Sequence, residues 1–110
     1  MDVTEYVNGL TEQGKTDKGI NTRVSGGNVS EDILGISLDT IVSSDVLMYQ
    51  NLTRLKDIVK NKRRADALAN AIRQYYVVKN GKKFPKLHIY MQERGETSAA
   101  YIRSLLDKYR

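Results

Sequence analysis

The sequence feature that most constrains the fold is an apolar helical period that begins after Ser44. The period is carried by apolar side chains spaced four and three residues apart, as on one face of an amphipathic helix. These side chains are Met48, Leu52, Leu55 and Val59. Ser44 or Asp45 can cap the free N–H groups of the first turn. We therefore expect a helix from this cap to about Asn61.

A second helix is predicted almost directly after the first. Its apolar stripe consists of Ala65, Leu68, Ala69, Ile72, Tyr75 and Tyr76. The link between the two helices is Lys62-Arg63-Arg64, three consecutive positive charges. Gly81 tolerates a positive φ and can end this helix. Asn80-Gly81 could instead turn a hairpin that joins residues 75–78 to residues 83–91. We favour the helix cap.

Two short segments show strand-like alternation. Residues 33–42 alternate partly and predict either a short strand or a first helical turn. Residues 86–91 alternate cleanly, with Leu87, Ile89 and Met91 on one face and Lys86, His88 and Tyr90 on the other. This pattern is typical of a strand with one buried face. A helix starting at Pro85 is the competing interpretation, because proline suits a first helical position. We favour the strand.

Residues 1–32 are rich in Gly, Thr, Asn, Ser and charged residues, and their apolar residues have no period. We interpret them as a flexible N-terminal arm, with a brief helix near residues 3–10 and a flexible joint at Gly26-Gly27. Residues 33–110 form the folded domain. At its end, Thr97 or Ser98 caps a last helix. The inward side chains of that helix are Tyr101, Ile102, Leu105, Leu106 and Tyr109.

The charge of the chain is unevenly distributed. Residues 1–50 contain three basic and eight acidic residues, whereas residues 51–110 contain fifteen basic and five acidic residues. Such asymmetry indicates a polyanion-binding domain. The chain has no Cys and one His, His88, so we expect no enzyme, no cofactor and no metal site. No signal peptide or membrane-spanning run is evident, and we expect a cytoplasmic protein.

The segment ERGETSAAYIRSLLDKYR resembles the second helix of ribbon-helix-helix DNA-binding proteins of the Arc, CopG and MetJ type. In that family paired strands of two subunits enter the major groove. The resemblance implies that Thr97 and Ser98 hold phosphate and that the following apolar residues form a dimer core. The family's first helix is missing if residues 86–91 are the ribbon. The ribbon could instead be residues 75–78, or residues 36–42 in an earlier copy. Residues 87–109 could also form a helix-turn-helix.

The overall plan is similar to that of SegB-like centromere-binding proteins of DNA partition systems. The fold class is accordingly predicted as mainly α with a short β-strand: a flexible arm followed by a dimeric ribbon-helix-helix-like or helix-turn-helix domain. The resemblance implies that the arm contacts a ParA-type ATPase through Lys15, Lys18 and Arg23.

We predict a nucleoid-associated homodimer that binds double-stranded DNA, as a partition adaptor or a transcriptional repressor. The DNA-binding candidates are Lys62, Arg63, Arg64, Lys82, Lys83, Lys86, His88, Tyr90, Arg94, Thr97, Ser98 and Arg103. The alternative is a small helical interaction protein, such as a viral structural or inhibitory factor. Its partner surface would be the stripes at residues 48–59 and 68–76. RNA binding ranks lower, because the stacking aromatic sheet of common RNA modules is missing.

Overall fold

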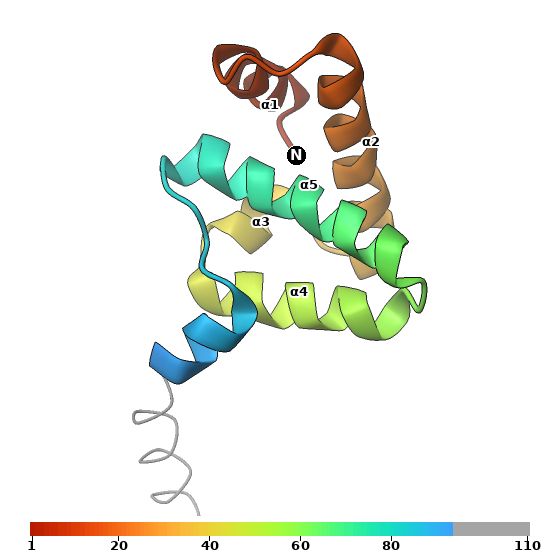
Figure 1. Ribbon diagram of the computed structural model, residues 1–110, viewed down its shortest axis with the longest axis vertical. Helices are drawn as coiled ribbons and strands as arrows, with labels where there is room; N and C mark the ends of the chain where they lie inside the picture. The colour runs from red at the N-terminus through yellow and green to blue at the C-terminus, as the bar shows by residue number, and fades with distance from the viewer. Residues whose placement is uncertain (94–110) are drawn as a thin grey trace, which may run out of the picture.

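The computed structural model describes residues 1–93, and this part of the chain is helical without any strand. The helices are α1 (Val3–Glu12), α2 (Asp17–Leu34), α3 (Leu38–Val42), α4 (Asp45–Ile58) and α5 (Lys62–Asn80). Residues 87–93 are helical as well. In Figure 1 α5 runs diagonally across the molecule, between α1 and α2 above and α4 below.

Side-chain caps set the start of each labelled helix. A polar side chain accepts a hydrogen bond from a first-turn N–H in every case, which satisfies a donor that has no partner within the helix. The caps are Asp2, Thr16, Ser37, Ser44 and Asn61. Helices α2 and α5 end at Gly35 and Gly81, whose φ angles of 68° and 70° are left-handed. The predicted helix from Ser44, the helix that follows it and the Gly81 cap are therefore confirmed.

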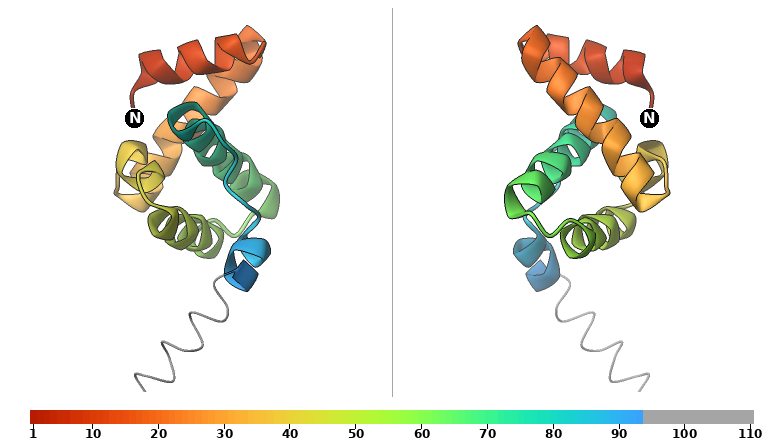
Figure 2. Two further views of the ribbon diagram at one scale, coloured as in Figure 1. Left: turned by 90° about the vertical axis from the view of Figure 1, so that its left-hand side faces the viewer. Right: turned by 90° about the vertical axis from the view of Figure 1, so that its right-hand side faces the viewer.

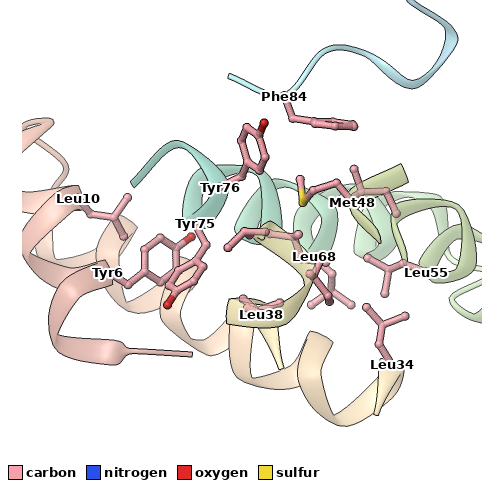
Figure 3. Packing of buried hydrophobic residues seen from close by; sticks show 14 of the residues in the cluster. Tyr6, Leu10, Leu34, Leu38, Met48, Leu55, Leu68, Tyr75, Tyr76 and Phe84 are labelled. Atoms are coloured by element: carbon pink, nitrogen blue, oxygen red, sulfur yellow. The ribbon is translucent and has the colours of Figure 1, made fainter. Parts of the chain in front are cut away.

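Helix α5 is the centre of the packing, and it contacts all four of the other labelled helices. Its inward side chains meet apolar residues from α1, α2, α3 and α4 in one core (Figure 3). The fully buried apolar members of this core are Tyr6, Leu10, Leu38, Ile41, Met48, Leu52, Leu55, Ile72 and Tyr75. One hydrophobic core thus unites the first helices with the last ones.

The first 32 residues are not a flexible arm. They form α1 and most of α2, and α2 makes the largest helix–helix contact of the described chain, with α5 (Figure 2). Gly26 and Gly27 lie inside α2 at the close approaches of the fold. A Cβ on Gly26 would lie 2.9 Å from the Cβ of Ala71, and one on Gly27 would lie 3.2 Å from a methyl of Leu38. The predicted flexible joint at Gly26-Gly27 is instead a helical site where the absence of side chains allows close packing.

Two tyrosines fasten α5 to the N-terminal helices. The Tyr6 ring meets the Tyr75 ring edge-on at 5.0 Å between centroids, and its hydroxyl donates to the Ala71 carbonyl at 2.6 Å. Tyr75 donates to the Asp39 carboxylate and accepts from the Asp2 N–H at 2.9 Å. Both hydroxyls are satisfied inside the fold, as buried polar groups require.

The predicted strand at residues 86–91 is wrong. The Tyr90 N–H donates to the Lys86 carbonyl at 2.9 Å, which is a helical hydrogen bond, and residues 87–93 follow Pro85 as a helix. Tyr90 is buried against Tyr49 and Phe84, whereas Ile89 and Met91 are exposed. Burial therefore follows a helical spacing, and the alternation of six residues was misleading.

Residues 33–42 are not a strand either, because they comprise the end of α2, a turn and α3. Residues 75–78 lie inside α5. All three segments proposed as the ribbon are thus helical or at helix ends. The predicted fold class, a ribbon-helix-helix-like domain with a short β-strand behind a flexible arm, is contradicted by the helices of residues 1–93.

Candidate polyanion-binding surface

Four exposed bases surround the start of α5. Lys60 lies in the turn after α4, whereas Lys62, Arg63 and Arg64, predicted as the link between the helices, form the first turn of α5. The other four labelled helices have an acidic residue in their first turn, but α5 has none. The amino end of a helix carries a partial positive charge, which acidic side chains normally offset. In α5 that partial charge and the side-chain charges have the same sign, so the start of the helix is a strongly positive end.

Three hollows follow α5 from this turn to the loop after its end. Their volumes are about 200, 250 and 200 Å³. The first and second share Lys56 and Asp66, and the second and third share Asn70 and Arg73. The shared residues make the three hollows neighbours along α5, and we call the three together the basic trough. Its polar lining residues are Lys56, Lys60, Lys62, Asp66, Asn70, Arg73, Gln74 and Lys83.

The far end of the trough is held by Arg73. Its guanidinium donates to the carbonyls of Phe84 and Pro85, at 2.9 and 3.1 Å, and lies 5.7 Å from the centre of the Phe84 ring. Desolvation lowers the pKa of this guanidinium, as burial of a cation does. Arg73 therefore positions the segment that carries Lys82, Lys83 and Lys86, all of which are exposed.

The bases of the trough are not neutralised within the described chain. Within residues 1–93, Lys79 is the one lysine that forms side-chain ion pairs within 4.0 Å. Its partners are Glu5 and Asp39, and it lies on the opposite side of α5 from the trough. Five bases and one acid, Asp66, line the trough itself. Like charges held side by side without counter-ions create a field that attracts anions.

The structure places the predicted DNA-binding bases that it describes in two groups, at the two ends of α5. Lys62, Arg63 and Arg64 form its first turn, and Lys82, Lys83 and Lys86 follow its end; of these six residues, Lys62 and Lys83 line the trough. His88 is exposed on the following helix. Tyr90 is 7% exposed and belongs to the core, so it does not share an exposed face with Lys86 and His88. Arg94, Thr97, Ser98 and Arg103 lie outside the described residues.

The three bases predicted to contact an ATPase lie at the turn before α2 and in its first half. Lys18 is exposed, and Lys15 is half-buried. Arg23 is also half-buried and donates to the Gly19 carbonyl at 3.0 Å. Lys18 and Arg23 are on a folded helix, and none of the three bases lines the trough.

Of the polar residues that line the trough, only Lys62 and Lys83 were predicted DNA-binding residues. The others are Lys56, Lys60, Asp66, Asn70, Arg73 and Gln74. Asn70, Arg73 and Gln74 stand on the polar side of a helix that was predicted correctly. A helical projection of residues 62–80 places all three opposite Leu68, Ile72 and Tyr75, and this signal could have found them. The clusters of consecutive bases drew attention instead.

Two kinds of feature are absent from residues 1–93. No group of three or more His, Asp or Glu side chains is close enough to hold a metal ion there. None of the helices in this part has the length and apolar character needed to cross a membrane. Comparison of the chain with protein-family models, with curated proteins and with solved structures found no match.

Proposed function

We propose that this chain binds double-stranded DNA through the basic trough. The observation that carries the proposal is the set of bases without ion-pair partners that α4, α5 and the segments flanking α5 contribute to the trough. Lysine and arginine neutralise phosphates and release the counter-ions of DNA, which supplies most of the affinity of such surfaces. A chain with a sequence pI of about 9.5 adds a favourable overall charge.

The dimensions of α5 suit the major groove. Its 19 residues span about 28 Å at 1.5 Å per residue. A helix fits the groove of B-DNA, whose width is about 12 Å. Lys60 and Lys62 at one end and Lys82 and Lys83 at the other would reach the phosphates that border the groove. The proposal thus replaces a strand ribbon with a helix as the inserted element.

The homodimer and the roles as repressor or partition adaptor stay predictions, and binding through α5 depends on none of them. A twofold dimer requires a palindromic site with half-sites one helical turn apart or a multiple of it. Sedimentation of the full chain with and without duplex would give its stoichiometry. Binding of a ParA-type ATPase through Lys15, Lys18 and Arg23 is a separate proposal, tested by titrating that ATPase.

The alternative of a helical interaction protein loses its proposed surface. Met48, Leu52 and Leu55 are buried, as are Ile72 and Tyr75 in the second stripe. Both stripes pack against each other and against α1, α2 and α3 in the chain's own core. A partner could reach them only after the core had opened.

The test is a titration of a labelled random-sequence duplex with the full chain, followed by fluorescence anisotropy at several salt concentrations. We expect an affinity that falls steeply with salt. The variant Lys60→Ala/Lys62→Ala removes two bases that line the trough. It should bind more weakly and reduce the logarithmic salt slope by roughly two, about one for each phosphate contact.

Lys15→Ala/Lys18→Ala is the matched control, because it removes two bases outside the trough. The control should keep nearly the whole slope. Absence of binding at low salt would overturn the proposal, and so would equal losses in the two variants. Circular dichroism melting shows whether each variant is folded.

A further inference from the structure

The outward face of α5 carries a regular row of side chains between the two basic ends. Arg63, Ala67, Asn70 and Gln74 follow one another at spacings of four, three and four residues, which places them on one stripe of the helix. Arg63, Ala67 and Asn70 are exposed, and Gln74 is half-exposed. The opposite stripe, with Leu68, Ile72 and Tyr75, is core, so this row faces out of the fold.

The side-chain amides of Asn70 and Gln74 make no hydrogen bond within the fold, in contrast to those of three asparagines on or next to α4 and α5. Asn51 donates to the Leu47 carbonyl, Asn61 caps α5, and Asn80 donates to the Val42 carbonyl at 3.1 Å. Within residues 1–93 the side-chain amides of Asn70 and Gln74 make no hydrogen bond. Their donors and acceptors are open to a ligand.

The same amides lie between the cations of the trough. Asn70 lines both the middle hollow, with Lys56, and the last hollow, which also contains Gln74 and Lys83. If these basic side chains hold the phosphate backbone of DNA, the nucleobases would lie opposite the amides. Arg73 is nearby, but its guanidinium is already engaged with the carbonyls of Phe84 and Pro85.

We infer that Asn70 and Gln74 read base edges in the major groove, with adenine as the preferred base of each, and that Arg63 reads guanine. A carboxamide pairs with adenine through two hydrogen bonds: its N–H donates to N7, and its oxygen accepts from the N6 amino group. A guanidinium pairs with O6 and N7 of guanine. Ala67 between them is small enough for close approach and suits a thymine methyl. The inference rests on the proposed DNA binding and assigns the residues that would make it sequence-specific.

The experiment is selection of bound duplexes from a random pool by the full chain, followed by affinity measurements on the selected duplex. We expect an enriched motif that contains adenine. The variant Asn70→Ala/Gln74→Ala should lose the adenine preference at defined positions. Its affinity for the selected duplex should fall by roughly tenfold or more for each amide, while its affinity for random duplex stays within about twofold.

Asn28→Ala/Gln50→Ala is the matched control. It removes one exposed asparagine and one exposed glutamine, from α2 and α4, and should select the parental motif. Binding of random duplex without any enriched motif overturns this inference and leaves the proposed function standing. If Asn70→Ala/Gln74→Ala selects the same motif as the parent chain, this inference is also overturned and the proposed function stands. Failure to bind any duplex, or enrichment only from a single-stranded RNA pool, overturns both.

Discussion

Gly26 of α2 and Ala71 of α5 face each other so closely that a methyl group on Gly26 would lie 2.9 Å from the Ala71 side chain. Ala71 is buried, so neither helix can move aside without disturbing the core. This pair fixes the distance at which the two longest helices of the described chain cross (Figure 2).

Gly26→Ala should destabilise the protein, although alanine is the better helix former by about 1 kcal/mol. The overlap with Ala71 costs about 1–3 kcal/mol, and we expect a net loss of up to about 2 kcal/mol in urea unfolding. Ser25→Ala in the same helix is the control, since Ser25 is exposed.

A compensating change sharpens this test. Gly26→Ala/Ala71→Gly moves the methyl group from one helix to the other. The double variant should be less destabilised than the sum of the two single variants. Additive losses would show that α2 and α5 do not meet at these residues.

Arg73→Ala should loosen the segment that follows α5. The substitution removes the hydrogen bonds to the carbonyls of Phe84 and Pro85 and the contact with the Phe84 ring. We expect a loss of about 1–3 kcal/mol, because hydrogen bonds from a charged donor are among the stronger ones. Limited digestion with trypsin should show faster cleavage after Lys83. Arg64→Ala, an exposed arginine of the same helix, should leave that rate unchanged.

Acid should weaken the contact of Asp39 with Tyr75. The hydrogen bond from the Tyr75 hydroxyl holds the pKa of Asp39 below its usual value, and the ammonium groups of Met1 and Lys79 add to this effect. The resulting stability is present above the unfolded pKa of about 3.9. It is lost as the pH falls through the lowered folded value. Urea midpoints measured below about pH 4 should therefore fall less steeply in Asp39→Asn than in the parent chain.

Alkali should act on Tyr75 and Tyr76. Burial raises the pKa of each hydroxyl to about 12, and hydrogen bonds to Asp39 and Asp45 contribute in the same direction. Because the folded pKa exceeds the unfolded value of about 10, their stability is complete below pH 10 and is lost as the pH rises toward 12. A spectroscopic titration of tyrosinate should show late ionisation that coincides with unfolding. Tyr76→Phe should delay that unfolding.

Helices α4 and α5 could be predicted because local and long-range signals agree there. Ser44 and Gly81 mark their outer ends, and the apolar period between them is the core face. Helix α2 was missed because Gly19, Gly26 and Gly27 lower its helix propensity. Two of these glycines, Gly26 and Gly27, are needed for close packing on other segments. Composition alone could not distinguish glycines that allow close helix packing from glycines of a flexible joint.

Residues 86–91 show a different limit. Their alternation fits a strand, while Pro85 fits a helix start, and six residues do not decide between the two. Contacts far along the chain do: Tyr90 stacks on Tyr49 at 5.3 Å and also meets Phe84. Of the bases that line the trough, Lys62 and Lys83 were among the residues predicted from the sequence. Arg73, which holds one end of the trough in place, requires knowledge of where the chain turns.

Helix α5 touches α1, α2, α3 and α4, and this has a consequence for how its outer face can behave. A helix held on several sides resists rotation about its own axis. The directions in which Arg63, Asn70 and Gln74 project are therefore set by the packing of the core. Such a face adapts poorly to a ligand whose pattern is one step out of register. Its selectivity would come from rigidity, and substitutions deep in the core that rotate α5 by a few degrees would alter what it accepts without touching the surface.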